Sequence, residues 1–219
     1  IGQGIALAAA RAGAHVIGVG RSAMDETAAL IAADGGEFTG LLCDLADLDA
    51  ARTTLDTAWD LRGRIDGLVN NAGIIRRNDA LDFTEDDWDA VVDVNLKTLF
   101  FLSQAYARYV FAQSDLQGRI VNIASLLSFQ GGIRVSSYTA AKHGVLGVTR
   151  LLANEWAARG LNVNAIAPGY ITTKNTGALR ADPDRNEAIL ARIPAGRWGD
   201  PSDIGGAAVF LLSRASDYI

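Results

Sequence analysis

Short apolar stretches alternate with longer amphipathic stretches along the whole chain. Five short stretches are rich in Val, Ile and Leu and are bounded by Gly, Asp, Asn or Pro, which is typical of strands covered on both faces. They lie at residues 15–20, 38–44, 65–73, 118–125 and 161–168. The stretches between them have helical periodicity and predict helices over residues 3–13, 23–34, 47–62, 84–113, 137–159 and 201–213.

Strands that alternate with helices predict βαβ units with right-handed crossovers. The expected fold class is therefore α/β, with a single-domain, doubly wound parallel sheet of the Rossmann type. No repeat, low-complexity tract or linker interrupts the 219 residues, so we expect one domain over residues 1–219. Residues 170–197 carry Gly, Pro and charge between recognisable elements, and we expect them to form a mobile lid.

Composition and charge narrow the function classes. The chain has 49% hydrophobic and 21% charged residues and a net charge of −5, without a long basic run. Neither nucleic acid nor an anionic membrane is therefore an expected partner. The apolar stretch 5–20 contains Arg11 and His15 and predicts no membrane span, and no metal-ligand spacing is present. A single cysteine, Cys43, fits a reducing, cytoplasmic location.

Polar and glycine-rich residues gather where the predicted strands end. These positions are Gly20 and Arg21, Asp44, residues 70–73, Ser125, and Pro168 with Gly169. The ligand of an open parallel sheet lies beyond the carboxyl ends of its strands. Five strand ends of this kind therefore predict a binding site along one edge of the sheet.

Two glycine-containing stretches are consistent with a nucleotide at that edge. Gly2 and Gly4 lead into an Ala-rich helix, whose N-terminus favours a pyrophosphate, although glycine before a helix is also common elsewhere. The sequence NNAG at 70–73 leaves little side-chain bulk at a strand end. It either forms an ordinary turn or provides a floor for a flat ring.

Tyr138 and Lys142 lie one turn apart on a predicted helix, from which both can point toward Ser125. An ammonium about 4 Å from a phenol favours the phenolate by about 4 kcal/mol at an effective dielectric constant near 20. This predicts that the pKa of Tyr138 is lowered by as much as about three units. Most bare Tyr-x-x-x-Lys pairs are surface accidents, but the combination with Ser125 favours proton transfer to or from a substrate oxygen.

Together these residues resemble the short-chain dehydrogenase/reductase family, in its single-domain branch. The shared motifs are Ile1-Gly2, Asp44, NNAG at 70–73, Asn95 in VNLK, Ser125, YTAAK at 138–142, and Pro168-Gly169 with Thr173. The likeness covers nearly the whole chain at family-like spacing. It implies an enzyme that transfers a hydride between a nicotinamide cofactor and a substrate carbon, while the protein supplies position and the proton.

The resemblance also implies a role for each matching residue. Tyr138 would be the general acid/base, and Ser125 would orient the reacting oxygen. Lys142 would hold the nicotinamide ribose and lower the Tyr138 pKa, and Asn95 would anchor a water of a proton relay. Besides Tyr138 and Lys142, the implied cofactor contacts are Ile1, Gly2, Arg21, Asp44, Leu45, Asn71, Ala72, Gly73, Pro168, Gly169, Ile171 and Thr173.

The choice of nucleotide depends on the end of the family's second strand, where an acidic residue binds the ribose 2′-hydroxyl. This chain has Gly20, Arg21 and Ser22 there, with no carboxylate. An arginine pairs with a 2′-phosphate, so NADP is favoured over NAD. The alternative is that Arg21 stacks on adenine in an enzyme that accepts NAD.

The loops near the site are most similar to sugar-acid dehydrogenases of this family, of the deoxygluconate and gluconate type. The expected substrate contacts are Ser125, Tyr138, Gln130 for a sugar hydroxyl and Arg134 for the carboxylate. Arg76 and Arg77 are further candidates for the carboxylate. Each arginine is equally well interpreted as a solvated loop charge or a subunit contact.

Three functions remain open at this point. The first is a sugar-acid dehydrogenase, and the second is another reductase of the family, such as a 3-oxoacyl-carrier-protein reductase. The third is a nucleotide-binding regulatory module without turnover, against which the presence of Tyr138 and Lys142 argues. The apolar helices 84–113 and 137–159, with the resemblance, imply a homotetramer.

Both ends of the chain look truncated relative to the family. Only Ile1-Gly2 remains of the pattern Thr-Gly-x-x-x-Gly-Ile-Gly that follows the first strand, and the last strand is also lacking. Because the first strand is central in the family's sheet, two strand edges would lose their partner. We therefore expect the 219-residue polypeptide to be unstable or inactive and its full-length parent to be active, which expression of this polypeptide tests.

Overall fold

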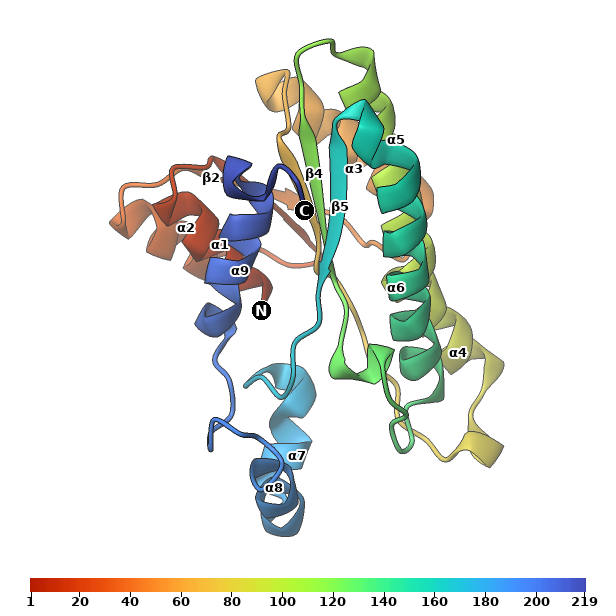
Figure 1. The fold of residues 1–219 in the computed structure, drawn as a ribbon. Coiled ribbons are helices and arrows are strands. Elements are labelled where there is room, and N and C mark those ends of the chain that lie inside the picture. Colours follow the sequence, from red (N-terminus) through yellow and green to blue (C-terminus); the bar gives the residue numbers. More distant parts are fainter.

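The computed structural model describes residues 1–219 as two parallel sheets flanked by helices (Figure 1). In the first sheet, β1 (Val16–Gly20) pairs with β2 (Phe38–Leu42). The second sheet has the order β3 (Gly67–Asn70), β4 (Gly118–Ile123), β5 (Leu161–Ile166). The five predicted strands are all present and parallel, and the α/β fold class is confirmed.

Helices lie on both sides of the sheets (Figure 1). On one side are α3 (Leu48–Arg62), α5 (Thr98–Ala112) and α6 (Ser136–Trp156), and on the other are α1 (Gly2–Arg11), α2 (Asp25–Ala33) and α9 (Gly205–Leu212). The ends of α3 show how the sequence sets such boundaries. Asp47 accepts hydrogen bonds from the first backbone amides, and Gly63 ends the helix at a φ of 66°, where glycine is unstrained.

Strand β4 is the centre of the hydrophobic core, since all six of its residues are buried. On one side, Ile120 packs with Tyr106 of α5 and Leu152 of α6. On the other side, Val121 packs with residues of α1 and α9, Ile5 among them. A strand held on both faces has little freedom to move, so the residues that follow it, including Ser125, have a rigid support.

The facing edges of β1 and β3 have no strand partner. Both edges line one cavity of about 900 Å³, whose lining is mostly apolar. The packing of α1 against α9 and β4 connects the two sheets instead. This arrangement agrees with the expected sheet that lacks a central strand. The expected instability of the isolated polypeptide stays a prediction.

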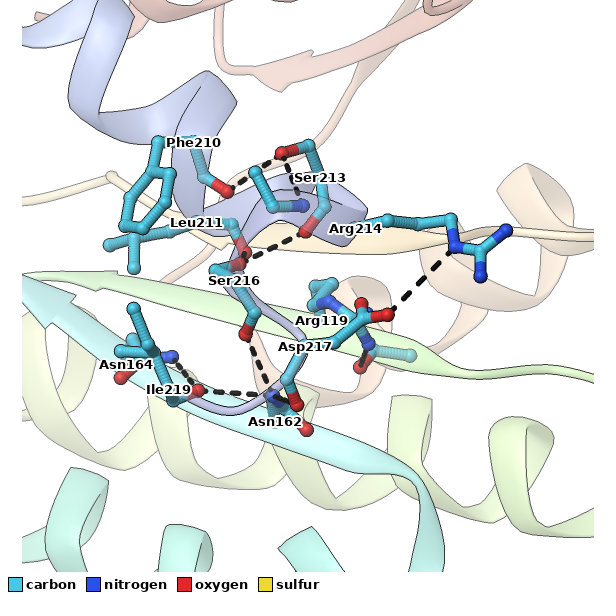
Figure 2. Close-up of polar contacts among 12 residues, drawn as sticks. Arg119, Asn162, Asn164, Phe210, Leu211, Ser213, Arg214, Ser216, Asp217 and Ile219 are labelled. Carbon is cyan, nitrogen blue, oxygen red and sulfur yellow. Dashed lines mark hydrogen bonds and ion pairs between the residues drawn. The ribbon is translucent and has the colours of Figure 1, made fainter.

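The residues that follow α9 are fastened to the outer edge of the second sheet (Figure 2). The side-chain amides of Asn162 and Asn164, both in β5, donate to the backbone carbonyl of Ile219 at 3.0 and 2.9 Å. Arg119 of β4, which is nearly buried, forms an ion pair with Asp217. These contacts give polar partners to side chains of β4 and β5, although the Arg119 Nε atom has none.

The expected lid, residues 170–197, contains two short helices that the hydrophobic pattern did not predict. They are α7 (Gly177–Ala181) and α8 (Pro183–Leu190), and they extend away from the sheets (Figure 1). Asp182 caps α8 and Pro183 occupies its first turn, which is a helix-start signal present in the sequence. The mobility of this segment stays a prediction.

Candidate active site

Ser125 lies directly beyond the end of β4, and it begins a 3₁₀ turn, Leu126–Ser128. Its Oγ accepts a hydrogen bond from the backbone amide of Leu127 at 3.1 Å. Because the amide supplies the proton of that bond, the hydroxyl proton of Ser125 is available for another acceptor. Ser125 lies close enough to Tyr138 to lower the pKa of the phenol, so the predicted pair of hydroxyls is brought together.

Tyr138 and Lys142 lie one turn apart on α6, as the sequence predicts. The Nζ atom of Lys142 donates to the carbonyl of Ile123, the last residue of β4, at 2.5 Å. The same atom lies 5.6 Å from the centroid of the Tyr138 ring. The lysine side chain is only 4% exposed, so its ammonium is held between the strand end and the tyrosine.

The pKa of Tyr138 shifts in the direction opposite to the sequence-based expectation. Burial raises this pKa, while the hydrogen bond from Ser125 and, to a smaller extent, the charge of Arg77 lower it. The ammonium of Lys142 is directed at the Ile123 carbonyl rather than at the phenol oxygen. The predicted lowering by Lys142 is therefore wrong for this structure. The phenol is protonated at neutral pH, which is the form that donates a proton.

Burial also changes the ionisation of Lys142. It lowers the pKa of the ammonium from 10.5 to about 8, because a charged group loses its hydration inside the protein. The cation is therefore present at neutral pH but is held at a cost in folding free energy. A buried lysine with a lowered pKa beside a half-buried tyrosine with a raised pKa is the kind of pair that marks functional sites.

Asn95 lies in a π-helical segment, Asp93–Lys97, between α4 (Glu85–Val92) and α5. The helical stretch predicted over 84–113 is therefore confirmed, with a π-helical turn in its interior that the pattern did not predict. The Asn95 side chain, 1% exposed, accepts from the backbone amide of Ile74 at 2.8 Å and donates to its carbonyl at 2.9 Å. These bonds fasten the loop after β3 to the helix, and π-helical turns are frequent at functional sites. The role of anchoring a water stays a prediction.

The N-terminus of α1 faces the loop that follows β3. A Cβ atom at Gly2 would lie only 2.6 Å from Nδ2 of Asn71, so a larger residue would collide there. Gly2 thus approaches Asn71, and both line one cavity together with Ala72. Bare backbone at a helix N-terminus fits a pyrophosphate, which supports the expected dinucleotide.

The residues expected at the adenosine end follow the two strands of the first sheet. Arg21 follows β1, is exposed and has no carboxylate partner. Asp44 follows β2, and one of its carboxylate oxygens accepts the backbone amide of Ala46 at 3.0 Å. The carbonyl of Leu45 accepts the hydroxyl of Thr98 at 2.8 Å, which fastens this strand end to α5.

The residues expected at the nicotinamide end run from β5 past the Ser125 loop. The carbonyl of Pro168 accepts the backbone amide of Leu126 at 3.0 Å, and Gly169 follows. Ile171 forms an isolated bridge with Gly199, and Thr173 caps the 3₁₀ turn Lys174–Thr176. This strand extension therefore passes beside Ser125, where the reacting end of a cofactor is needed.

Two of the three candidate arginines are neutralised by nearby carboxylates. Arg134 has its Nε atom 3.3 Å from Asp79, and Arg76 has its Nε atom 3.1 Å from Asp87. Arg134 also has a φ of 63°, a strained conformation for a residue other than glycine. Its backbone carbonyl accepts the amide of Asn78 at 3.2 Å. Arg134 thus ties two loops together, which disfavours the predicted role in binding a carboxylate.

Arg77 differs from its neighbours because no carboxylate lies within ion-pair distance of it. Its guanidinium donates to the backbone carbonyl of Asn175 at 2.9 Å, in the expected lid. It lies close enough to Tyr138 to lower the pKa of the phenol. Gln130, the other expected substrate residue, is half-buried and makes no side-chain hydrogen bond within the protein. Arg77 is therefore the cation best placed to meet an anionic substrate.

No three His, Cys, Asp or Glu side chains are arranged to hold a metal ion. None of the helices is both long and apolar enough to cross a bilayer.

Comparison with known proteins decides the family. Residues 1–219 match the family described as Enoyl-(Acyl carrier protein) reductase. The chain is 56% identical over 219 residues to the 2-dehydro-3-deoxy-D-gluconate 5-dehydrogenase of Escherichia coli (strain K12), covering all of this chain and 86% of that protein. The chain belongs to the short-chain dehydrogenase/reductase family.

Two solved structures of this family are similar over the whole chain. One, from Agrobacterium tumefaciens with bound NADP, is assigned as a 2-deoxy-D-gluconate 3-dehydrogenase and has 62% identity and a TM-score of 0.93, with 86% of its own chain covered. The other is a gluconate 5-dehydrogenase from Burkholderia cenocepacia in complex with NADP and tartrate, with 36% identity, a TM-score of 0.92 and 86% coverage. The expected Rossmann-type fold of this short-chain dehydrogenase is thereby confirmed.

Membership of the family settles the general activity. This short-chain dehydrogenase/reductase is an oxidoreductase that acts on CH–OH groups with a nicotinamide cofactor. The alternative of a regulatory module without turnover is therefore wrong. One residue that contacts the catalytic loop, Ser128, was not identified from the sequence. Its signal was the pattern Ser-x-x-Ser at 125–128, in which each serine can bond the other's backbone.

Proposed function

We propose that this enzyme transfers a hydride between NADP and a secondary alcohol or ketone of a sugar acid of the deoxygluconate or gluconate type. The observation that carries the proposal is the position of Arg77, a cation without an acidic partner, beside the Ser125–Tyr138 pair. The names of the E. coli and B. cenocepacia relatives support the same substrate class.

The chain's own residues would divide the chemistry between them. The bound nicotinamide would supply or accept the hydride. Tyr138 would donate a proton to the substrate oxygen during reduction, and Ser125 would donate a hydrogen bond to the same oxygen. Lys142, fixed on the Ile123 carbonyl, would hold the nicotinamide ribose. The strand extension from Pro168 to Thr173 would shield this oxygen from water.

Arg77 would bind the substrate carboxylate. A guanidinium presents parallel N–H donors that match the two oxygens of a carboxylate. Its hydrogen bond to the Asn175 carbonyl occupies one nitrogen and leaves other donors available. The same bond places the cation against the expected lid, so the charge that recognises the substrate also contacts the segment that would cover it.

We expect Arg77→Ala to lower kcat/KM for a sugar acid about 10- to 100-fold, since a hydrogen bond to a charged group contributes about 1.5–3 kcal/mol. For a neutral polyol that carries the same secondary alcohol without the carboxylate, the substitution should lower kcat/KM much less. Steady-state rates followed by NADPH absorbance measure both. Arg134→Ala is the matched control, because that arginine already has Asp79 as its partner. An equal loss of kcat/KM in the two variants would mean that neither arginine specifically binds the substrate carboxylate.

The substrate class itself is tested with a panel. Deoxygluconate- and gluconate-type acids and their keto forms are compared with 3-oxoacyl thioesters, because a 3-oxoacyl-[acyl-carrier-protein] reductase of Vibrio harveyi is 40% identical to this chain. Higher kcat/KM for the sugar acids supports the proposal. Turnover of the thioesters alone would replace it with the second reading, in which no carboxylate needs a cation.

The preference for NADP rests on Arg21. It is exposed, lacks an acidic partner and follows β1 at the adenosine end. Arg21→Asp should weaken NADP binding about tenfold or more by removing a charge-assisted bond to the 2′-phosphate, while NAD binding holds or improves. Titration of cofactor fluorescence gives both dissociation constants. An unchanged ratio of the NADP and NAD dissociation constants would mean that Arg21 does not contact the 2′-phosphate.

A homotetramer in the cytoplasm completes the proposed description. Trp88 of α4 and Leu151 of α6 are 42% and 49% exposed, and contacts between subunits would bury them. Both lie on the segments expected to pack in an assembly. The one cysteine, Cys43, is a buried free thiol, as is common in a reducing compartment.

A further inference from the structure

Ser128 joins the two elements that carry the catalytic groups. It is the last residue of the 3₁₀ turn after Ser125 and is 5% exposed. Its Oγ donates to the backbone carbonyl of Lys142, on α6, at 2.7 Å. The same oxygen accepts the backbone amide of Ser125 at 3.2 Å. One buried hydroxyl thus bridges the strand-end loop and the catalytic helix.

The directions of these bonds follow from the donors available. A backbone carbonyl has two lone pairs, so Lys142 accepts the Ser128 hydroxyl in addition to its partner along the helix. The Ser128 proton is then committed to Lys142, and its lone pairs face the Ser125 amide. The amide of Leu127 occupies a lone pair of the Ser125 hydroxyl in turn. The proton of Ser125 is left to point toward Tyr138 and the substrate.

From this bridge we infer that Ser128 is a positioning residue, which holds the Ser125 hydroxyl at its working distance from Tyr138 by fixing the Ser125 backbone to α6. The inference rests on the proposed roles of Ser125 and Tyr138. Catalytic geometry is sensitive to displacement, and a shift of about 1 Å can reduce a rate about a hundredfold. Without the Ser128 hydroxyl, the Ser125 amide has no other acceptor in the protein.

We expect Ser128→Ala to lower kcat about 10- to 100-fold and to leave the dissociation constant for NADP unchanged. The matched control is Ser137→Ala, at a fully buried serine of α6 whose hydroxyl makes no hydrogen bond. This substitution removes a buried hydroxyl from the catalytic helix without breaking a hydrogen bond to the Ser125 loop. Its kcat should therefore stay within about twofold of the parent's value. Similar kcat values for the two variants would overturn the inference.

Two readouts separate positioning from a general structural effect. The Ser125 hydrogen bond lowers the Tyr138 pKa, so a displaced Ser125 moves the limb of the pH–rate profile that reports Tyr138 to higher pH. A Ser125→Ala, Ser128→Ala double variant should lose no more activity than Ser125→Ala alone, because Ser128 acts through Ser125. If the double variant instead lost the product of the two single-variant losses in activity, the inference would be contradicted. An inert Ser125→Ala variant would instead overturn the proposed mechanism.

Two conservative substitutions of Ser128 test the inference even if the alanine variant does not fold. Ser128→Thr retains a donor and an acceptor and should recover most of the lost kcat. Ser128→Cys fills similar space with weak hydrogen bonding, and it replaces the alanine variant if that protein does not fold. A cysteine variant with the parent's melting temperature and a reduced kcat supports positioning by Ser128. The same variant with an unchanged kcat and an unmoved pH profile refutes it.

Discussion

Replacement of Tyr138 by phenylalanine should lower kcat of the intact enzyme by about 10²- to 10⁴-fold, the range supplied by a positioned proton donor. The half-buried phenol has a raised pKa, is protonated at neutral pH and lies beside Ser125, so its loss leaves the substrate oxygen without its acid. Nicotinamide absorbance follows turnover, and fluorescence titration checks that NADP still binds. The fold should survive, because the change removes one oxygen and keeps the ring.

Tyr109→Phe provides the comparison for this variant. Tyr109 lies on α5, and its hydroxyl donates to Asp56 of α3 at 2.7 Å rather than approaching Ser125. The same atom is removed in both variants, but only Tyr138 is near the reacting groups. Unchanged turnover in Tyr138→Phe would show that the proton comes from elsewhere, and the proposed mechanism would fail.

Lys142→Met should make the protein more stable and, at the same time, nearly inactive. The pKa of Lys142 falls from 10.5 to about 8 on folding, which corresponds to a penalty of about 3 kcal/mol below pH 8. Methionine fills similar space without a charge, at the loss of the bond to the Ile123 carbonyl, worth about 1.5 kcal/mol at the lower end for a charged group. The net gain of about 1.5 kcal/mol should raise the melting temperature by a few degrees.

The pH dependence of this gain has a definite sign. Below about pH 8, Lys142 is protonated in both the folded and unfolded states, so the difference between variant and parent is constant. Between pH 8 and 10.5 only the unfolded state retains the proton. The parent therefore gains stability with rising pH and approaches the variant.

Denaturant unfolding of the two proteins at a series of pH values measures this convergence. Lys97→Met is the control, because Lys97 is exposed and pairs with Asp93 at 3.1 Å, so its replacement should give no stabilisation. A Lys142→Met protein no more stable than its parent at pH 7 would mean that the buried ammonium carries no folding penalty. Retention of turnover would remove Lys142 from the mechanism.

The sequence predicted the strands well because each apolar run ends at a polar or glycine residue, and β4, covered on both faces, keeps Ser125 at a sheet edge. The π-helical turn between α4 and α5 was not predicted, since the segment Asp93–Lys97 has neither glycine nor proline. Its cause is tertiary: the side chain of Asn95 bonds the backbone of Ile74. Such a contact leaves no local signal.

The same limit applies to the binding residues. The sequence alone cannot distinguish the binding roles of Arg76, Arg77 and Arg134. These roles depend on the groups that contact each arginine in the folded protein. Carboxylates neutralise two of them, whereas the third meets the Asn175 carbonyl. The sign of the Tyr138 pKa shift was missed for a related reason, because spacing along a helix gives the proximity of Lys142 but not the depth of burial.

The residues expected to select the dinucleotide and those expected to transfer the proton lie at the ends of different strands. Arg21 and Asp44 follow β1 and β2, whereas Ser125 follows β4. Substitutions at Arg21 can therefore exchange one dinucleotide for the other while the Ser125 loop keeps its own hydrogen bonds.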